Sequence, residues 1–145
     1  MIGLIQRVTQ ASVSVDEHEI ARISRGLLTL VAVHREDEQR DIVRLAERIL
    51  SYRVFPDAKD RMNLSVEDVS GGLLLVPQFT LAADTKKGTR ASFTKGAAPE
   101  TASAYFDQLV ETCRNRLEQV ECGRFGANMQ VSLINDGPVT FWLES

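Results

Sequence analysis

A run of four apolar residues in the middle of the chain, Leu73-Leu74-Leu75-Val76, limits the possible folds more than any other segment. The side chains of a strand alternate between the two faces of a sheet, so a run that is apolar at every position leaves no face for water. We therefore predict a central strand over residues 72–79 that is covered on both sides. With 145 residues, the chain is long enough to build such a core in one domain covering residues 1–145.

Further strands are expected where apolar and polar residues alternate or where short apolar runs recur. Ala11, Val13 and Val15, for example, are separated by polar residues, which is the pattern of a half-buried strand. The other predicted strands are residues 1–9, 11–16, 19–23, 26–33, 129–134 and 139–143. Residues 60–65, 82–98 and 123–127 are expected to be connections, and the polar 82–98 segment is long enough to be a functional loop.

Two segments show the spacing of amphipathic helices. Residues 36–52 repeat apolar side chains on one face and charged side chains on the other, and a second helix is expected to begin at Pro99. These elements predict an α+β fold in which a curled, mostly antiparallel and barrel-like sheet packs with two main helices.

Composition excludes several classes of protein. No apolar stretch approaches the roughly 18 residues that a membrane span needs, and the N-terminus is typical of a first strand and not of a signal peptide. We therefore expect a cytoplasmic protein. Cys113 and Cys122 lack the partners of a zinc site and are expected to be plain thiols, so neither a metal nor another cofactor is predicted.

The net charge of −3 does not indicate nucleic-acid binding by the molecule as a whole. A local basic segment nevertheless exists, because Lys86, Lys87, Arg90 and Lys95 are accompanied only by Asp84. On charge alone, a solvated loop is the favoured interpretation, with a phosphate-binding patch as the alternative.

The segment Pro77-Gln78-Phe79-Thr80 follows the central apolar run. Backbone amides at the end of a strand can form an oxyanion hole for an ester carbonyl, and Thr80 adds a hydroxyl group. Judged by spacing alone, the segment is more simply a strand that runs into a loop. No histidine or carboxylate stands near Thr80 in the sequence, so a catalytic triad is not predicted.

The segment Asn135-Asp136-Gly137-Pro138-Val139-Thr140 is the second candidate. It is either a β-turn or a stiff backbone wall, since Gly137 has no Cβ and permits close approach to a ligand. Such a wall would reject one stereoisomer by collision.

Together, the two segments resemble the motifs of the D-aminoacyl-tRNA deacylases of the bacterial and eukaryotic type, Ser-Gln-Phe-Thr and Asn-X-Gly-Pro-Val-Thr. The similarity runs along the whole chain, through Met62-Asn63-Leu64 to Phe141-Trp142-Leu143. It implies a metal-free homodimeric hydrolase that cleaves the ester of D-aminoacyl-tRNA, and of glycine mischarged on the tRNA for alanine. L-aminoacyl esters would be excluded.

The resemblance also implies roles for single residues. Gln78, Phe79 and Thr80 would form the ester site, and the 2′-OH of the RNA would take part in the reaction. Gly137 and Pro138 would reach into the pocket of the other subunit and select the D-enantiomer. The remaining roles are bracing of this motif by Arg7, bordering of the adenosine pocket by Phe125 and Met129, and contact with tRNA phosphates by Lys86, Lys87 and Arg90.

One position departs from the family pattern, because Pro77 stands where the family has serine. Proline lacks both the hydroxyl group and the backbone N–H, so we expect a weaker but active enzyme. Two alternatives remain: a nucleic-acid-binding relative on the same fold that does not hydrolyse, and a small-molecule esterase or amidase. The esterase or amidase ranks last, since the chain has no G-x-S-x-G motif, no Cys-His pair and no set of metal ligands.

Overall fold

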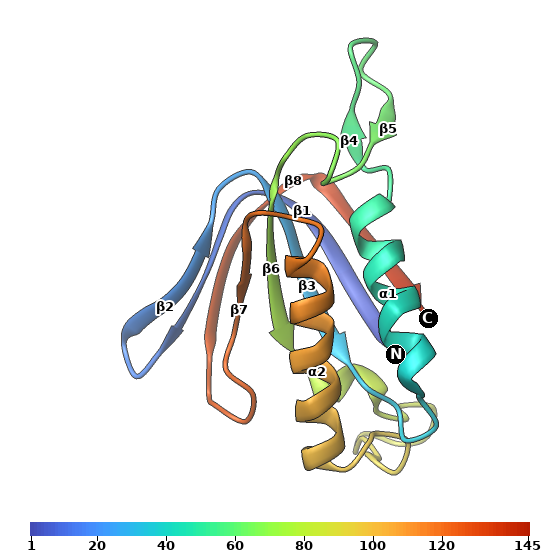
Figure 1. The fold of residues 1–145 in the computed structure, drawn as a ribbon. Helices are drawn as coiled ribbons and strands as arrows, with labels where there is room; N and C mark the ends of the chain where they lie inside the picture. Colours follow the sequence, from blue (N-terminus) through green and yellow to red (C-terminus); the bar gives the residue numbers. More distant parts are fainter.

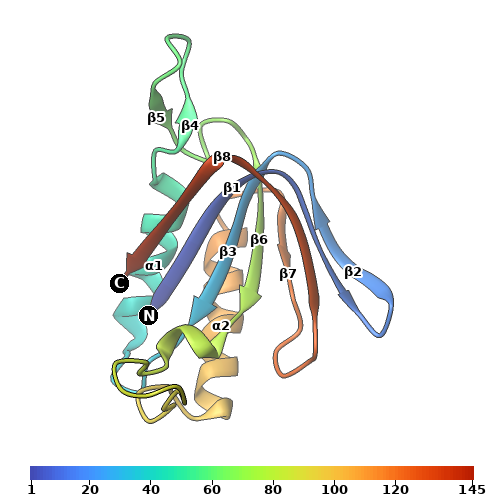
Figure 2. The same cartoon turned by 180° about the vertical axis from the view of Figure 1, so that it is seen from behind.

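The computed structural model describes all 145 residues as a curled sheet with two helices on one side (Figures 1 and 2). Six strands form the sheet in the order β2-β1-β3-β6-β7, and β8 pairs with β1. Two further strands, β4 and β5, form a separate hairpin. The elements in chain order are β1 (Ile2–Val15), β2 (His18–Ile23), β3 (Gly26–Ala32), α1 (Gln39–Ser51), β4 (Phe55–Pro56), β5 (Met62–Leu64), β6 (Gly72–Pro77), the 3-10 turn η1 (Phe79–Ala82), α2 (Pro99–Arg114), β7 (Val120–Cys122) and β8 (Gln130–Glu144).

The predicted central strand is confirmed as β6, which lies between β3 and β7 and is parallel to both. Leu73, Leu74 and Leu75 are fully buried. Beside this strand, Gly26 of β3 approaches Gly72 so closely that a Cβ on Gly26 would lie 1.9 Å from the Gly72 carbonyl oxygen. Only glycine fits there, and this close approach lets the two strands pair from their first residues.

β1 pairs with three other strands of the sheet. Its first half pairs with β3, its second half pairs with β2, and β8 pairs along nearly its whole length. The prediction of two separate strands, 1–9 and 11–16, is wrong because one strand of 14 residues runs through both. The strand bends where its register with β8 shifts, between Gln6 and Gln10, and an irregularity of this kind interrupts the alternation and looks like a strand boundary in the sequence.

The C-terminal strand is also continuous. Residues 129–134 and 139–143 were expected to be two strands joined by a turn, but β8 covers Gln130–Glu144 without interruption. The residues between the two predicted strands form the bulge opposite the bend of β1. The β-turn interpretation of residues 135–138 is therefore wrong.

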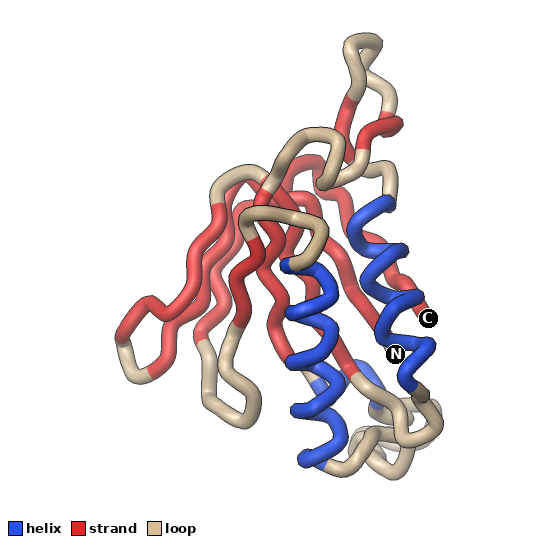
Figure 3. The backbone as a smooth tube through the Cα atoms, viewed as in Figure 1, coloured by secondary structure: helices blue, strands red, loops and turns tan.

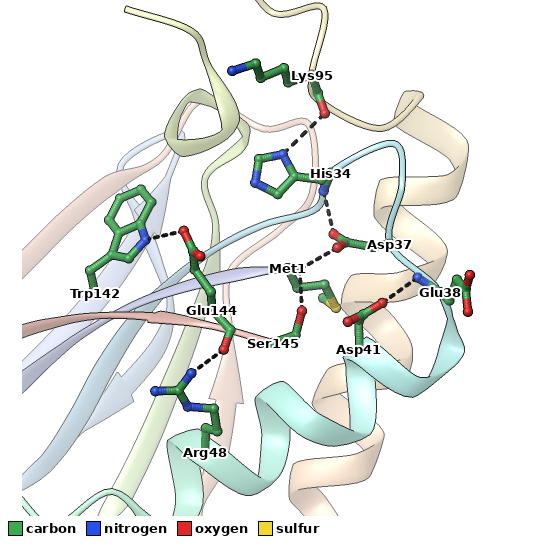
Figure 4. Close-up of polar contacts among 10 residues, drawn as sticks. All are labelled: Met1, His34, Asp37, Glu38, Asp41, Arg48, Lys95, Trp142, Glu144 and Ser145. Atoms are coloured by element: carbon green, nitrogen blue, oxygen red, sulfur yellow. Dashed lines mark hydrogen bonds and ion pairs between the residues drawn. The ribbon is translucent and has the colours of Figure 1, made fainter.

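The two helices lie side by side on one face of the sheet (Figure 3). They bury their apolar stripes in the largest core cluster, to which α1 contributes Leu45 and Ile49 and α2 contributes Phe106 and Leu109. Pro99 is the first residue of α2, as predicted. At the start of α1, the amide of Glu38 donates a 2.8 Å hydrogen bond to the Asp41 carboxylate (Figure 4).

The predicted fold class is confirmed: β1 is antiparallel to β2, β3 and β8, while β3, β6 and β7 form the parallel part. The sequence did not reveal β7 or the β4–β5 hairpin, which includes part of the expected connection 60–65. Both consist of strands of two or three residues, too short to show a period. None of the helices has the length and apolar character needed to cross a membrane.

Candidate active site

The first candidate motif lies where β6 ends. The structure corrects its predicted extent, because the strand stops at Pro77 and Phe79–Ala82 turn into a short 3-10 helix. The amide of Gln78 donates to the carbonyl of Val31 at 2.6 Å, which fixes the point of departure from the sheet. The Gln78 side chain then donates from Nε2 to Oγ1 of Thr80 at 2.6 Å. This leaves the Thr80 hydroxyl proton available to a ligand.

The backbone amides of Phe79 and Thr80 are the unpaired donors of this turn. Neither donates one of the hydrogen bonds made outside the helices and strands, and the first amides of a helical turn have no partner within it. Phe79 and Thr80 are both exposed. Two adjacent free N–H groups beside a hydroxyl can hold the oxygen of a polarised carbonyl group.

Two adjoining hollows open beside this turn, and Pro77, Gln78 and Phe79 line both. The larger one, of about 470 Å3, extends along the 123–127 loop to β8. Its remaining lining residues are Val76, Ala97, Pro99, Ala102, Phe125, Gly126, Ala127, Met129 and Val131. Phe125 and Met129 are thus brought next to the Gln78–Thr80 turn, and the mostly apolar lining suits a flat aromatic group.

The second candidate motif is the bulge of β8. The Gly137–Pro138 peptide bond is cis, and Gly137 has a φ of +144°. A Cβ at Gly137 would lie 2.6 Å from Cγ2 of Val139. The side chain of Asn135 spans the bulge, since its Nδ2 donates to Oγ1 of Thr140 at 2.9 Å and its Oδ1 accepts from the Val139 amide at 2.8 Å. Gly137 and Pro138 are left exposed at the tip of a well-fixed segment.

Arg7 lies beneath this bulge. Its Nε donates to the carbonyl oxygen of Asp136 at 3.0 Å and lies 3.3 Å from the carboxylate of the same residue. Its Nη1 donates to the carbonyl of Val54 at 2.5 Å, at the base of the β4–β5 hairpin. The Arg7 side chain is 12% exposed, so one largely covered guanidinium group joins the bulge to the hairpin.

Within one chain, the two motifs lie at opposite ends of the sheet (Figure 2). The bulge lies beside Val8 of β1, which is level with Gly26 of β3 and Gly72 of β6. The turn, in contrast, begins beyond Pro77 at the other end of β6. Five residue steps of a strand correspond to about 17 Å. A site that uses both motifs therefore needs a second copy of the chain.

The basic loop lies at the same end as the turn. The carboxylate of Asp84 accepts from the Lys86 amide at 3.0 Å and pairs with Lys95 at 3.2 Å, and these contacts lower the pKa of Asp84. Asp84 and Lys95 therefore neutralise each other. Lys86, Lys87 and Arg90 are exposed and take part in none of the ion pairs. The loop presents three free positive charges.

The loop is tied to the body of the molecule through the connection between β3 and α1. The amide of Arg35 donates to the Lys95 carbonyl at 3.0 Å, and Nδ1 of His34 lies 3.4 Å from the same oxygen (Figure 4). Phe93 of this loop, whose ring contacts Phe79, was not predicted from the sequence. The available signal was an aromatic residue inside a basic loop, a position where an apolar ring has little reason to stand unless it has a partner.

The chain is similar to known proteins along its full length. The family model described as D-Tyr-tRNA(Tyr) deacylase matches residues 4–144. A D-aminoacyl-tRNA deacylase from Alkalilimnicola ehrlichii is 61% identical over 145 residues, which are 100% of this chain and 97% of the relative. A D-aminoacyl-tRNA deacylase from Escherichia coli is 54% identical, with 99% of each chain covered.

Among solved structures, a c-Myc DNA Unwinding Element Binding Protein superposes with a TM-score of 0.95. It is 38% identical in sequence, and the match covers 100% of this chain and 99% of the other. The same sheet and helices therefore occur in a protein named for binding a nucleic acid.

Proposed function

The chain belongs to the D-Tyr-tRNA(Tyr) deacylase family, and we propose that it hydrolyses the ester between a D-amino acid and the terminal adenosine of tRNA. Water adds to the ester carbonyl carbon, the bond to the ribose oxygen breaks, and that oxygen leaves with a proton. The products are a free D-amino acid and tRNA. The observation that carries the proposal is the pair of free amides at Phe79 and Thr80, in a chain that matches the family over residues 4–144.

In this proposal, the turn is the ester site. The amides of Phe79 and Thr80 stabilise the negative charge that develops on the carbonyl oxygen. Gln78 orients the Thr80 hydroxyl, with which it already shares a hydrogen bond. The 2′-OH of the terminal ribose assists the attack, so no side-chain base is required. Phe125 and Met129 border the hollow that receives the adenine.

We further propose that Gly137 and Pro138 select the enantiomer. Their carbonyl oxygens accept hydrogen bonds from the α-amino group of the substrate, and their backbone occupies the space that an L side chain needs. Glycine has no side chain that could collide with this backbone, so glycine mischarged on the tRNA for alanine is also a substrate. Arg7 acts by holding the bulge through Asp136.

The partner required by this arrangement is a second copy of the chain. The two motifs lie at opposite ends of one sheet, so Gly137 and Pro138 must serve the ester site of the other subunit. The outer edge of β8 supports this arrangement, because the strand pairs only with β1 and carries two exposed apolar side chains. These are Ile134, which is 52% exposed, and Trp142, which is 48% exposed. The cytoplasmic location expected from the sequence is part of the same proposal.

The decisive experiment compares the release of tyrosine from D-Tyr-tRNA and L-Tyr-tRNA in the presence of EDTA, with Gly137→Ala as the variant. We expect release from the D-ester alone in the unsubstituted chain. In Gly137→Ala, the added methyl group collides with Val139 at a φ of +144°, so the bulge shifts and release from the D-ester falls at least ten-fold. Equal release from both esters would refute selection by this motif.

The second candidate function is nucleic-acid binding without hydrolysis, which the similarity to the DNA Unwinding Element Binding Protein favours. Turnover separates the two functions. A pure binder retains tRNA or DNA on a filter but releases no amino acid from either ester. Multiple turnovers of D-Tyr-tRNA would exclude it.

A further inference from the structure

An exposed pair of aromatic rings borders the smaller of the two hollows. The rings of Phe79 and Phe93 lie 5.2 Å apart at an angle of 50°, and they are 61% and 49% exposed. The hollow beneath them measures about 280 Å3, and ten of its fourteen lining residues are hydrophobic. Large apolar rings that remain in water beside an open hollow indicate a surface that a ligand covers.

Phe93 is held firmly in place. Its neighbour Ser92 pairs with Asp84 through two backbone hydrogen bonds of 2.8 and 3.0 Å. The carbonyl of Phe93 itself accepts from the Gly96 amide at 3.1 Å, and Ala97 donates at 3.0 Å to Val33, which directly follows β3. The ring therefore lies on a fixed backbone. A ligand that stacks on the ring loses little binding free energy to the ordering of this segment.

The charges of the loop that carries Phe93 indicate what that ligand is. Lys86, Lys87 and Arg90 belong to the loop that carries Phe93, and none of them has an acidic partner. Over residues 84–95, four positive charges stand against the single negative charge of Asp84, although the whole chain carries −3. Aromatic rings beside unpaired cations are the combination that binds single-stranded nucleic acid, since bases stack on the rings and phosphates contact the cations.

We propose that Phe93, together with Phe79, forms a second nucleotide subsite that stacks a base upstream of the terminal adenosine in the single-stranded 3′ end of the substrate RNA. This inference rests on the proposed function, because it extends the same site by one hollow. The two hollows share Pro77, Gln78 and Phe79 among their lining residues. When the terminal adenosine of the RNA enters the larger hollow, the nucleotide before it therefore lies beside the smaller hollow.

The test compares two D-tyrosyl esters, one of full-length tRNA and one of adenosine alone, which lacks every upstream base. In Phe93→Ala, we expect kcat/KM for D-Tyr-tRNA to fall about ten-fold or more, which is the usual effect of removing one stacking partner. For D-tyrosyl-adenosine, it should change less than two-fold. An equal loss on both esters, or no loss on either, would overturn the subsite.

Two further variants separate stacking from packing. Phe93→Tyr keeps the aromatic ring and should retain the activity on D-Tyr-tRNA, whereas Phe93→Leu keeps the apolar volume and should lose it like Phe93→Ala. Val43→Ala, at a half-exposed position on α1, is the matched control for loss of an exposed apolar side chain. If Phe93→Leu is as active as the unsubstituted chain, the role of Phe93 is packing and the proposal is wrong.

The binding of uncharged RNA makes the subsite testable apart from hydrolysis. The Kd of the 3′-terminal trinucleotide of tRNA should rise about ten-fold in Phe93→Ala, and the Kd of adenosine should not change. If the chain hydrolysed neither ester, the proposed function would be refuted. The Kd of the trinucleotide would still decide whether the nucleotide subsite exists. Equal binding of the trinucleotide by both proteins would overturn it.

Discussion

Pro77 lies at the junction of the sheet and the proposed ester site. It is the last residue of β6, pairs with Val31 of β3 and lines both hollows. The following amide, that of Gln78, still donates to Val31 at 2.6 Å, so proline does not disturb the departure of the chain from the sheet. The fold therefore accommodates the proline. Compared with the serine of the family motif, this position lacks the hydroxyl group and the backbone N–H.

We expect Pro77→Ser to raise kcat for the D-ester without changing the fold. Serine restores a donor and an acceptor beside Gln78, and the extended backbone of β6 accepts either residue. The measurement is single-turnover deacylation of D-Tyr-tRNA, with the melting temperature recorded to show that stability is preserved. An unchanged kcat would mean that the serine of the family motif is not needed in this chain.

At this scale, the sequence indicated candidate residues whose chemistry is rare and missed those whose role depends on a contact. Gly137 and Pro138 stood out because few residues offer a free backbone or a rigid ring, whereas Gln78 became a strong candidate only through the resemblance. Asn135 looked like an ordinary turn residue, and only the structure shows that its side chain bridges the bulge. Such bridges join residues through geometry that a linear pattern does not contain.

At the scale of elements, helix α2 carries Cys113 on its buried face. Burial raises the pKa of this thiol from 9.0 to about 12. In the unfolded chain, the thiol ionises near pH 9, whereas in the folded chain it stays neutral. The stability that the neutral thiol preserves is therefore complete below pH 9 and is lost as the pH rises from 9 towards 12.

The expected result is a steeper alkaline loss of stability in the unsubstituted chain than in Cys113→Ala. Between pH 7.5 and 10.5, the difference should reach about 2 kcal/mol, because each pH unit above the unfolded pKa is worth about 1.4 kcal/mol. Urea unfolding at both pH values provides the free energies. Cys122→Ala is the control, since that thiol is only half-buried. Equal losses in all three proteins would contradict the assignment to Cys113.

The basic loop of residues 82–98 should make tRNA binding sensitive to salt. If Lys86, Lys87 and Arg90 contact phosphates, the affinity for uncharged tRNA falls as salt rises, with a slope of about 0.7 to 0.9 per contact. Replacing all three by alanine should flatten the slope by about two units. Lys59→Ala, in the β4–β5 hairpin, is the control and should leave the slope unchanged. A slope that is the same in the triple variant would remove the loop from tRNA binding.

Elements with a clear period were predictable, and the continuity between them was not. The helices and β6 showed apolar patterns over many residues. β1 and β8 were each divided in two, because a bulge looks like a boundary when the partner strand is unknown. The predicted loop 82–98 was correct as a connection, but nothing in its composition placed Phe93 against Phe79.

At the scale of the whole molecule, the two motifs of the proposed site lie at opposite ends of one sheet. No pattern in a single sequence reports this separation, since it depends on which strands are neighbours and in which register. The homodimer was expected only from the resemblance, and the geometry of the subunit offers a physical reason for it: if the proposed site uses both motifs, each chain contributes one half of two different sites.

This separation predicts complementation between two inactive chains. A Gly137→Ala chain retains its turn, and a Gln78→Ala chain retains its bulge, so one site of a mixed dimer contains both intact parts. Random pairing gives half mixed dimers with one intact site out of two, so about a quarter of the original activity should return. The measurement is deacylation of D-Tyr-tRNA after the two proteins are denatured together and refolded. Recovery no greater than the sum of the separate variants would place both motifs in the site of one chain.

The pairing of β1 with β8 also sets the order in which the molecule can be completed. Ile2 pairs with Glu144, so β1 is synthesised well before the strand that pairs along it. Until β8 has been made, the β8-facing edge of β1 has no partner in the nascent chain. The sheet can be completed only after β8 has been synthesised, so the contacts of longest sequence separation are also those whose second partner is available last.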